Sequence, residues 1–590
     1  MKKYCLYSLL LLMSALFTWV SCSDNDDESN SSVSLTKTSL AFVSAGGAQS
    51  FQITASDNWT VSLPSDAWYS LSAVSGSSGT SMVTVSVSSI CFTKRSDTLS
   101  FVSGNASAQL IVSQEATTDL VYTVSTPDSL LSSVLSTGGT LTFTINSTAP
   151  VVSVSNDNQW ISFDKQSLGF GNSDLTVTVA ANTGEKRTGY FYLKAEGAAD
   201  LRFVIVQNPA NFFVSYNTDP IAADKTGMTS TALQLSEQMV LGWNLGNTLE
   251  ATWGSFTAPT QTLIQNVRAA GFNTIRIPCA WYYNSNQSTA KIHDTWFATV
   301  KQVVQWAIDE NMYVMLNIHW DKGWLEDNID DNVKIEEVVA RQKAMWEQIA
   351  TAFRDYDEHL LFASCNEPGQ NNGMGTDGIA NLKKCHQACL DAVRSTGGKN
   401  TYRTIIIQGP VTNIAQTVAA NQSFFPTDIE ENGVTRLMVE DHFYDPYKFT
   451  IMSADASWGK RWLYWGDNLS SVDTDRNSTY SVTNIRSSMK SLYDTYVSKG
   501  IPVVIGEFSP SYYSEAPSFC PGYDKDLHKA SVAQYLKQCV ETMKDFGIIP
   551  VYWDNSGLNS GNSGLFNRNT GELDPDRKVF VDSLIHPVLL

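Results

Sequence analysis

The chain has 590 residues, and this length predicts two to four domains because one hydrophobic core rarely grows so large. Its formal net charge of −19 argues against nucleic acid as a partner, since no basic stripe is present to displace counterions. The same charge argues against adhesion to an anionic surface by charge alone. An acidic, aromatic-rich chain suits a neutral polymer, although many secreted proteins are acidic without such a partner.

The N-terminus has the features of a secretion signal. A start with two lysines precedes the apolar run 6–20, which is too short for a comfortable membrane span. The run ends at Val20-Ser21-Cys22 and an acidic stretch follows at 23–28. This resembles a bacterial lipoprotein signal, which implies a signal peptide over 1–21, a lipidated Cys22, an acidic tether over 22–32 and an anchor in the outer membrane, at its cell surface or its periplasmic face. Trp19 stands where such signals usually have Leu, so plain secretion is the alternative.

Beyond residues 5 and 22, seven cysteines remain, an odd number whose spacings form no disulfide framework. Cys279 and Cys365 lie in or beside predicted strands, where cysteine usually acts as a small core residue. The stretch Cys385-His386-x-x-Cys389 has the residue types of a metal site. On a helix, however, His386 points away from the face that the two cysteines share, and no second ligand pair follows at zinc spacing. We therefore expect no metal and no cofactor.

Two segments, 33–116 and 121–210, are rich in Ser, Thr and Val and contain short alternating runs separated by Gly and Ser clusters. That pattern predicts all-β sandwiches. The segments align by Trp68 with Trp160 and by the closing runs Ile111-Val112-Ser113-Gln114 and Ile205-Val206-Gln207-Asn208, which indicates an internal repeat of one module. The modules resemble the BACON family, whose name implies carbohydrate binding. Because a Trp recurs at one place in each copy, we expect it to be a core residue. A spacer role and glycan binding both stay open.

From about residue 215 to 590, short buried strand patterns alternate with helical patterns, which predicts right-handed crossovers and a parallel sheet. The predicted strands are 239–246, 273–278, 313–319, 360–367, 403–409, 436–444, 501–508 and 549–555. The predicted helices are 260–270, 294–311, 335–356, 378–395, 483–499, 527–545 and 574–584. Eight strands over this length predict an α/β fold, the (β/α)8 TIM barrel. An open doubly wound sheet is the alternative, but no phosphate-cradling Gly-rich turn follows the first strand.

Polar side chains stand at the carboxyl end of nearly every predicted strand, which is where barrel enzymes keep their chemistry. The fourth strand ends in Asn366-Glu367, and the seventh ends in Gly506-Glu507. Two strand-end glutamates are what glycoside hydrolysis needs, one as acid and one as nucleophile or base. A cation near Glu507 would keep it ionised. Arg276, at the end of the second strand, is the strand-end guanidinium available, and Tyr444 can donate a hydrogen bond to the same carboxylate.

The motifs GWNLGNTLE, IRIP, NIHWD, NEP, HFYDP, GEF and WDN occur in this order. The set resembles glycoside hydrolase family 5, a resemblance that implies retention of anomeric configuration. It implies Glu367 as acid/base, Glu507 as nucleophile and Asn366 as the ligand of the 2-hydroxyl of the reacting sugar. The family's remaining shell corresponds to Arg276, His319, His442 and Tyr444, with Trp553 as the sugar platform. Asn247 and Trp320 are further candidate substrate-binding residues.

The two histidines can hold sugar hydroxyls or brace Asn366. A metal role is disfavoured because no H-E-x-x-H spacing occurs, and Ser-His-Asp hydrolysis is disfavoured because no G-x-S-x-G elbow occurs. Other carboxylates compete for the catalytic roles. Alternation sends Glu440 and Asp441 to opposite sides of their strand, and Glu250 and Asp321 can touch substrate hydroxyls. We expect none of these four to be the catalyst.

Many aromatic residues fall in loops on this face, and half of them are expected to be loop core. They are Trp253, Trp281, Tyr282, Tyr283, Trp320, Trp324, Trp458, Trp462, Tyr464, Trp465, Tyr512 and Tyr513. The rest predict several sugar subsites in an open cleft, with the insertion 449–482 as one wall. The sequence thus predicts a monomeric, retaining endo-β-1,4-glucanase acting on cellulose-type, mixed-linkage or xyloglucan chains. The alternatives are an endo-β-mannanase and a non-catalytic surface glycan-binding lipoprotein.

Overall fold

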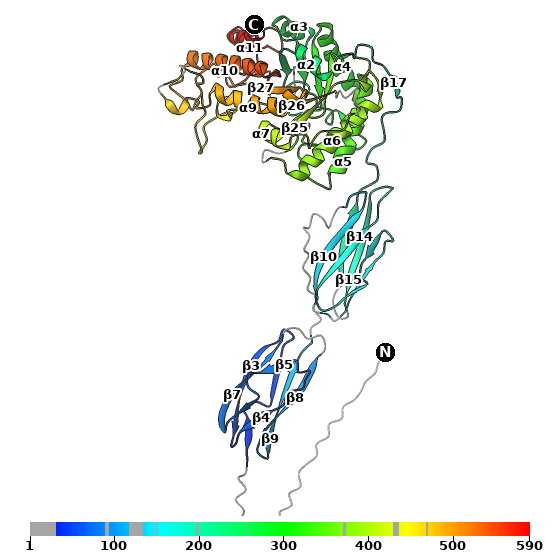
Figure 1. Cartoon of the computed structure of the whole chain (residues 1–590), viewed down its shortest axis with the longest axis vertical. Helices are drawn as coiled ribbons and strands as arrows, with labels where there is room; N and C mark the ends of the chain where they lie inside the picture. The colour runs from blue at the N-terminus through cyan, green and yellow to red at the C-terminus, as the bar shows by residue number, and fades with distance from the viewer. Residues whose placement is uncertain are drawn as a thin grey trace, which may run out of the picture. The chain divides into compact units, whose positions relative to one another are not determined.

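The computed structural model describes residues 31–88, 94–116, 134–147, 149, 151–195, 200–254, 257–369, 373–428, 436–467, 470–471 and 473–589. The predicted signal peptide, Cys22 and most of the acidic tether lie outside the described residues. The chain forms two compact units, of which the first holds the β-sandwich strands and the second holds the barrel (Figure 1). Along the described residues, none of the helices combines the length and apolar character that a membrane crossing needs.

The first predicted sandwich is present as two sheets whose inward side chains alternate with exposed ones, as the sequence pattern predicts. One sheet has the order β1-β3-β7-β5 and the other β2-β9-β8-β4-β6. The strands are β1 (Val33–Leu35), β2 (Ser39–Phe42), β3 (Gly47–Ala55), β4 (Trp59–Val61), β5 (Tyr69–Leu71), β6 (Ser75–Gly76), β7 (Gly79–Val87), β8 (Arg95–Ser103) and β9 (Ala106–Gln114).

The second predicted sandwich has a three-stranded sheet, β10-β14-β12, and a four-stranded sheet, β13-β11-β15-β16. The strands are β10 (Gly139–Ser147), β11 (Val152–Asn156), β12 (Ile161–Phe163), β13 (Ser167–Leu168), β14 (Gly171–Val179), β15 (Arg187–Lys194) and β16 (Leu201–Gln207). Buried aromatic side chains fill the space between its sheets, including a stacked pair, Phe191 and Phe203.

The repeated Trp does not occupy the core, which corrects the prediction made from its recurrence. Trp68 is half-buried, and the Arg95 guanidinium lies 4.4 Å from its ring centroid. Arg95 Nη2 in turn donates to Gln114 Oε1 at 2.8 Å. The second copy pairs Arg187 with Gln207 in the same way. In the first sandwich the guanidinium therefore packs on a half-buried ring and joins it to the amide, which gives these landmarks a structural role.

The second unit contains a closed barrel of eight parallel strands, in the order β18-β19-β22-β23-β25-β26-β27-β28, which confirms the predicted (β/α)8 fold. The strands are β18 (Gly242–Leu245), β19 (Thr274–Ile277), β22 (Tyr313–Asn317), β23 (Leu360–Ala363), β25 (Ile405–Asn413), β26 (Leu437–His442), β27 (Val503–Phe508) and β28 (Ile548–Asp554). Most of their side chains are buried on both faces, as parallel strands between helices require.

All seven predicted helices are present in the barrel unit, each within a few residues of its expected bounds. They are α3 (Gln261–Ala269), α4 (Asp294–Asp309), α5 (Ile335–Ala352), α6 (Thr376–Ser395), α9 (Val482–Thr495), α10 (Lys525–Asp545) and α11 (Lys578–Leu589). Three short helices were not predicted: α2 (Ala232–Gln238), α7 (Ile414–Ala420) and α8 (Tyr447–Thr450). Leu235 of α2 belongs to one buried cluster with strand residues such as Met315 and Leu361, so α2 closes an end of the barrel.

Irregular pairing between the later strands places the polar residues at the barrel's carboxyl end. The β26–β27 register shifts after Asp441, so that His442 lies opposite Glu507. The β25–β26 register shifts after Gln408, and the same stretch holds Val411 and Thr412 at φ of 50° and 44°. Positive φ is a genuine outlier for β-branched residues, and both register shifts and strain concentrate at functional sites.

The connector before the barrel is held in place by α5. Glu347 on α5 accepts hydrogen bonds from the Ser215 hydroxyl and from the Tyr216 backbone N–H. Asn217 also donates to the Ser395 carbonyl at the end of α6. These contacts fix the start of the barrel unit.

Candidate active site

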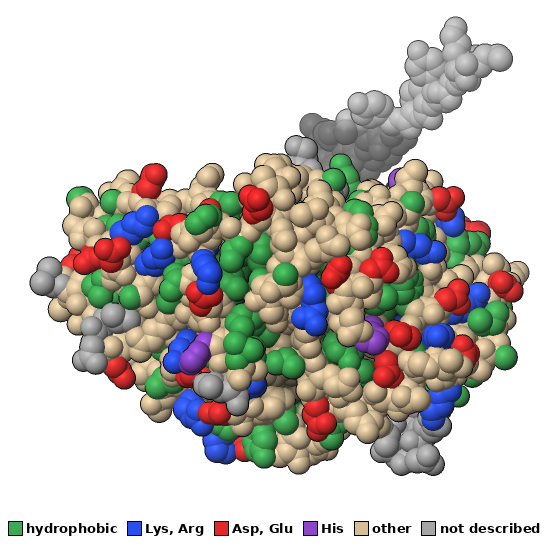
Figure 2. Space-filling view, turned by 90° about the horizontal axis from the view of Figure 1, so that it is seen from above, with side chains coloured by type: hydrophobic (Ala, Val, Ile, Leu, Met, Phe, Trp, Pro, Cys, Tyr) green, Lys and Arg blue, Asp and Glu red, His purple; other side chains and the backbone are tan. Residues whose placement is uncertain are grey.

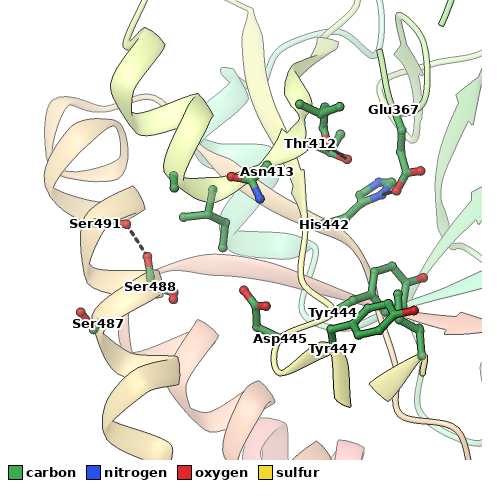
Figure 3. A pocket seen from close by; sticks show the side chains of 14 residues that line it. Glu367, Thr412, Asn413, His442, Tyr444, Asp445, Tyr447, Ser487, Ser488 and Ser491 are labelled. Atoms are coloured by element: carbon green, nitrogen blue, oxygen red, sulfur yellow. Dashed lines mark hydrogen bonds and ion pairs between the residues drawn. The ribbon is translucent and has the colours of Figure 1, made fainter. Parts of the chain in front are cut away.

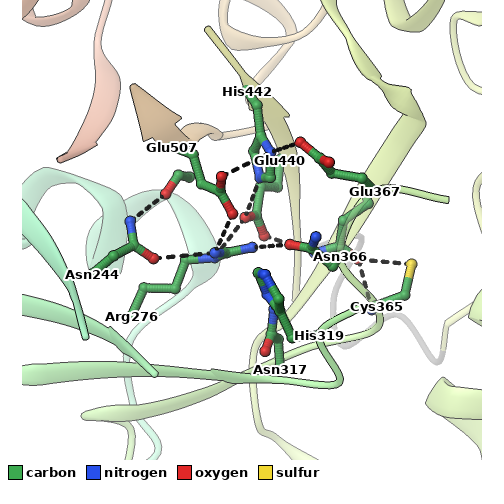
Figure 4. A network of polar contacts seen from close by, with 12 residues as sticks. Asn244, Arg276, Asn317, His319, Cys365, Asn366, Glu367, Glu440, His442 and Glu507 are labelled. Carbon is green, nitrogen blue, oxygen red and sulfur yellow. Dashed lines mark hydrogen bonds and ion pairs between the residues drawn. The ribbon is translucent and has the colours of Figure 1, made fainter. Parts of the chain in front are cut away.

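Four barrel strands bring the predicted site residues together at their carboxyl ends (Figure 4). Arg276 is on β19, Asn366 and Glu367 follow β23, His442 ends β26, and Glu507 is on β27. Strands of a closed barrel converge on one mouth, so residues that are 231 positions apart in sequence, such as Arg276 and Glu507, meet there.

The two predicted glutamates lie close together and differ in exposure. One oxygen of Glu367 and one of Glu507 are no more than 4.8 Å apart. The Glu367 side chain is 47% exposed, whereas that of Glu507 is 6% exposed. A separation of about 5–5.5 Å is typical of retaining glycosidases, and inverting ones need about 6.5–9.5 Å to admit a water. The geometry therefore fits double displacement.

Arg276 is completely buried and connects several members of the site. Its Nη1 lies 2.8 Å from Glu507 Oε1, its Nη2 donates to Asn366 Oδ1 at 2.8 Å, and its Nε lies 2.9 Å from Glu440 Oε1. The prediction that Arg276 supports the Glu507 charge agrees with this geometry. Asn366 is braced by Arg276 and not by a histidine, which corrects that alternative. An amide whose oxygen is held this way keeps its Nδ2 free to face a sugar hydroxyl.

Glu507 has a second donor, as predicted. The Tyr444 hydroxyl donates to Glu507 Oε2 at 2.9 Å. Burial raises the pKa of Glu507, and His442, Arg276 and Tyr444 act in the opposite direction. A carboxylate that accepts from both a guanidinium and a phenol has its lone pairs oriented, which is what a nucleophile near an anomeric carbon requires.

His442 lies between three carboxylates. Its Nδ1 is 2.7 Å from Glu367 Oε1, and its Nε2 is 3.3 Å from Glu440 Oε1. Burial lowers the pKa of His442, but the Glu507 charge and the hydrogen bonds to Glu367 and Glu440 raise it to about 10. The ring is thus an imidazolium at neutral pH. The same cation lowers the pKa of Glu367 against the effect of burial. In the free site the shared proton therefore resides on His442.

The atoms of Glu367, His442 and Glu507 also lie close enough together to suit a metal ion. A histidine ligand must be unprotonated, whereas the pKa of His442 is raised to about 10. Arg276 already places a positive charge 2.8 Å from Glu507. The donor set is therefore a poor fit to a metal. His386, the other metal candidate, lies buried between the Ser364 hydroxyl and the Gln408 carbonyl.

His319 and Trp553 form a pair beside this network. Their rings are stacked at 5.8 Å with an angle of 7°. The Nδ1 of His319 is 3.1 Å from Asn317 Nδ2, and burial lowers the pKa of His319, so the ring is neutral. Trp553 is half-buried. This arrangement suits a platform for the apolar face of a sugar, in agreement with the prediction for Trp553.

Asn247 and Trp320 are the two remaining residues that were predicted to bind substrate. Asn247 lines a pocket of about 440 Å³ together with Trp253 and Arg568, formed by the loops after β18 and β28. Trp320 is 41% exposed. Both residues lie at the barrel mouth, where a substrate could reach them. Their contacts with substrate remain predictions.

Two predictions about the carboxylates need correction. Glu250 is buried and accepts from the backbone N–H groups of Asn247 and Thr248. Asp321 is buried and accepts from the backbone N–H groups of Tyr282 and Tyr283. Both carboxylates hold loops in place and are not available to a substrate, because the oxygens of a buried carboxylate accept hydrogen bonds from nearby donors.

About half of the loop aromatics are core residues, as expected. Trp281, Trp324, Tyr464, Trp465, Tyr512 and Tyr513 are buried, whereas Trp253, Tyr283, Trp320 and Trp458 are exposed. Within the insertion 449–482, Tyr464 and Trp465 therefore stabilise the loop itself. Trp458, which is 60% exposed, is the residue of that insertion best placed to meet a ligand.

Sequence reasoning missed the role of Glu440. It is completely buried, faces the barrel axis and contacts Arg276, His442 and Gln408. Alternation correctly separated it from Asp441, which accepts from the Thr417 hydroxyl. A side chain at Gly506 would meet Glu440 Oε1 at 1.9 Å. The Gly before Glu507 was therefore the available signal, since only glycine leaves room for this carboxylate.

A closed (β/α)8 barrel with two carboxylates at this spacing, at the ends of the fourth and seventh strands, defines a glycoside hydrolase of the retaining kind. Residues 233–559 match the family described as cellulase (glycosyl hydrolase family 5). The chain belongs to this family.

Several relatives that match the chain are endoglucanases. A xyloglucan-specific endo-β-1,4-glucanase of Bacteroides ovatus is 33% identical over 71% of this chain and 83% of its own length. Among solved structures, a xyloglucan-specific β-1,4-glucanase from a ruminal metagenomic library, in complex with XXLG, is 35% identical with a TM-score of 0.55, covering 61% of this chain and 96% of that one. A broad-specificity endoglucanase from Bacteroides salanitronis is 31% identical with a TM-score of 0.53, covering 61% and 95%.

The two sandwiches also match known modules. Residues 32–117 match the viral BACON domain, and residues 150–208 match the BACON domain described as a putative N-terminal binding domain. These matches confirm two BACON-type modules before the catalytic barrel.

Proposed function

We propose that this protein is an endo-β-1,4-glucanase in which Glu507 is the nucleophile and Glu367 the acid/base. The observation that carries the assignment is the pair of carboxylates within 4.8 Å of each other. Of the two, Glu507 accepts hydrogen bonds from Arg276 and Tyr444. The half-exposed Glu367 faces the open side of the site, where a leaving oxygen would lie.

The reaction has two steps. Glu507 attacks the anomeric carbon while Glu367 protonates the glycosidic oxygen, and the sugar on the leaving side departs with that proton. The product is a glycosyl ester of Glu507 with the anomeric configuration inverted. Glu367, now a carboxylate, removes a proton from water as it attacks the same carbon. The second inversion restores the original configuration and frees Glu507.

Substrate binding supplies the protonation state that the first step needs. In the free site the Glu367 side chain is 47% exposed and its pKa is lowered by His442. A bound sugar covers this exposed half, which favours the neutral form because burial disfavours charge. When the ester forms, the charge of Glu507 disappears, which favours the ionised form of Glu367 for the second step.

Endo cleavage is supported by room on both sides of the glutamates. The pocket of about 440 Å³ lies over β18 and β28, whereas a second pocket of about 420 Å³ lies over β25 and β26, on the other side of the barrel mouth. A polymer bound across the mouth would thus have sugar units beyond both ends of the cleaved bond. The net charge of −19 and the scattered Lys and Arg side chains on the described part of the face in Figure 2 suit an uncharged chain.

We infer that xyloglucan and unsubstituted β-1,4-glucans are its substrates, because the matched relatives are named for these activities. The test compares Glu507→Ala and Glu367→Ala with Glu310→Ala, a control that removes a carboxylate on the amino-terminal side of the barrel. Reducing-sugar release is followed on xyloglucan, mixed-linkage glucan, carboxymethylcellulose and mannan. We expect the two site variants to lose at least 10³-fold in kcat. Surviving release in Glu507→Ala would refute the mechanism, and a preference for mannan would refute the substrate class.

We further infer that Cys22 is lipidated and anchors the enzyme in the outer membrane, and that the enzyme acts as a monomer. The first rests on the sequence Val20-Ser21-Cys22 and the acidic residues after it. The second is the oligomeric state predicted from the sequence. Membrane fractionation of Cys22→Ala and light scattering of the protein without residues 1–22 test these points. A variant that stays in the membrane fraction, or a dimeric mass, would contradict them.

The structural use of Trp68, Arg95 and Gln114, with an Arg–Gln bond that recurs in the second module, supports a spacer role for the sandwiches. Full-length protein is compared with a variant carrying Trp68→Ala in a pull-down with insoluble cellulose and xyloglucan-coated cellulose. Retention that depends on Trp68 would contradict the spacer role.

A further inference from the structure

The pocket of about 420 Å³ over β25 and β26 includes Glu367 but not Glu507 (Figure 3). Its walls come from the β25–α7 turn, the end of β26 and the serines of α9. Since a liquid water takes about 30 Å³, the pocket has room for roughly fourteen waters, which is more than one sugar residue needs. A site that touches the proton donor but not the nucleophile lies on the leaving-group side of the cleaved bond, because the acid points at the departing oxygen.

We propose that Asp445 is a specificity-determining residue in this pocket, where it binds hydroxyls of the leaving sugar and excludes acidic sugars. This inference rests on the proposed function of the two glutamates. The leaving-group side would then bind a neutral, hydroxylated sugar. Asp445 alone would distinguish this sugar from an acidic one.

The charges around the pocket carry the proposal. Of the fourteen described residues that line it, none is Lys or Arg, two, Glu367 and Asp445, are carboxylates, and the one cation, His442, lies 2.7 Å from Glu367, which leaves Asp445 as the unpaired charge of the lining. Figure 3 shows the Asp445 carboxylate directed into the pocket, with the Asn413 amide on the opposite wall. A carboxylate accepts hydrogen bonds from hydroxyls, whereas a uronate or carboxymethyl group there would face like charge.

Asn413 complements Asp445 as a donor. Its Oδ1 accepts from the Gln416 backbone N–H at 3.2 Å and so caps α7. This bond uses the amide oxygen and leaves the Nδ2 directed toward the pocket (Figure 3). The two side chains together offer an acceptor and a donor across a space of sugar size, which is the polar pattern of a site that orients a small ligand.

The strained turn ties this pocket to the acid. The Val411 backbone N–H donates to the Pro368 carbonyl at 2.9 Å, and Pro368 directly follows Glu367. Val411 and Thr412, at φ of 50° and 44°, form the pocket wall between this bond and Asn413. Strain of this kind persists only where the surrounding structure fixes it. The turn therefore sets Glu367 and the leaving-group pocket in one geometry.

The test separates sugar recognition from chemistry by changing only the leaving group. Asp445→Ala is compared with wild type on mixed-linkage glucan and xyloglucan, and on a nitrophenyl β-cellotrioside, whose aryl leaving group has no hydroxyls for Asp445. We expect kcat/KM to fall at least 10-fold on the polymers and to stay within twofold on the aryl glycoside. Asp494→Ala removes an exposed carboxylate that pairs with Lys490 on the outer part of α9, and it should change neither.

Asp445→Asn tests the charge itself. We expect its activity on carboxymethylcellulose, relative to hydroxyethylcellulose, to rise at least threefold over the wild-type ratio. An unchanged ratio would overturn the exclusion of acidic sugars. Equal losses of Asp445→Ala on polymers and aryl glycoside, or no loss on either, would overturn the recognition of the leaving sugar. Wild-type inactivity on both classes would instead refute the proposed function, and the inference with it.

Discussion

The Glu440→Gln variant tests whether the buried charge network stabilises the barrel. Glu440 is completely buried, 2.9 Å from Arg276 Nε and 3.3 Å from His442 Nε2. At an effective dielectric of about 20, a pair at 2.9 Å interacts with about 6 kcal/mol before desolvation is counted. Breaking a buried pair typically costs about 3–5 kcal/mol. Since Arg276 keeps Glu507 as a partner, we expect the variant to lose about 3 kcal/mol in free energy of unfolding at pH 7.

The same interaction gives a defined pH dependence. Burial raises the pKa of Glu440, but Arg276 and His442 lower it below its ordinary value of 4.5. A carboxyl whose pKa is lowered by folding stabilises the native state above its unfolded pKa and loses that effect as the pH falls through its folded pKa. The gap between wild type and Glu440→Gln should therefore be full at pH 7 and shrink below about pH 4.5.

Urea unfolding followed by tryptophan fluorescence measures this gap, because twelve of the sixteen tryptophans lie in the barrel. Asp441→Asn is the matched control. Asp441 is equally buried on the other side of the strand, and burial raises its pKa to about 7, so removing its charge should cost less than about 1 kcal/mol. Equal stability of Glu440→Gln and wild type at pH 7 would show that the Glu440 charge does not stabilise the barrel. A difference in stability that persists unchanged at pH 4 would show the same.

Three further results are expected. Tyr444→Phe removes the 2.9 Å hydrogen bond to Glu507. Because hydrogen bonds to charged groups contribute about 1.5–3 kcal/mol, kcat/KM on mixed-linkage glucan should fall about 10–150-fold. Wild-type activity of this variant would contradict the role of Tyr444. NMR of selectively labelled histidine should show His442 as an imidazolium up to about pH 9, because its pKa is raised to about 10, and a neutral ring at pH 8 would exclude the proposed proton location. Trp68→Ala should destabilise the first sandwich by about 2 kcal/mol, less than a full core truncation, with hydrolysis unchanged; calorimetry without a shift would show that the Trp68–Arg95 contact contributes little.

The barrel could be predicted from sequence because its strands are short apolar runs that end in polar residues, as in Leu360–Ala363 followed by Asn366-Glu367. Its register shifts could not, since the displacement that brings His442 opposite Glu507 depends on the neighbouring strand. The helix α7 was missed for a related reason. It has seven residues and begins after the strained Val411–Thr412 turn, a conformation that β-branched residues disfavour.

The two glutamates and Arg276 were identified because strand ends meet at one mouth. The hydrogen-bond partners within the site were harder to predict from the sequence. Asn366 is held by Arg276, and His442 binds Glu367 and Glu440, a pairing set by side-chain directions in three dimensions. The repeated Trp was wrongly predicted to be a core residue, because recurrence reflects a shared structural role and not burial. Trp68 and Trp160 are both half-buried, and Trp68 packs against Arg95.

Glu507 is the residue that we expect to carry the covalent intermediate. An activated 2-deoxy-2-fluoro β-cellobioside forms the glycosyl ester quickly and hydrolyses it slowly, so mass spectrometry of the inactivated, peptic-digested enzyme locates the sugar. We expect one fluorocellobiosyl group on the peptide that contains Glu507, and no labelling of Glu507→Gln. A label on Glu367, or turnover with an inverted first product and no label, would contradict it.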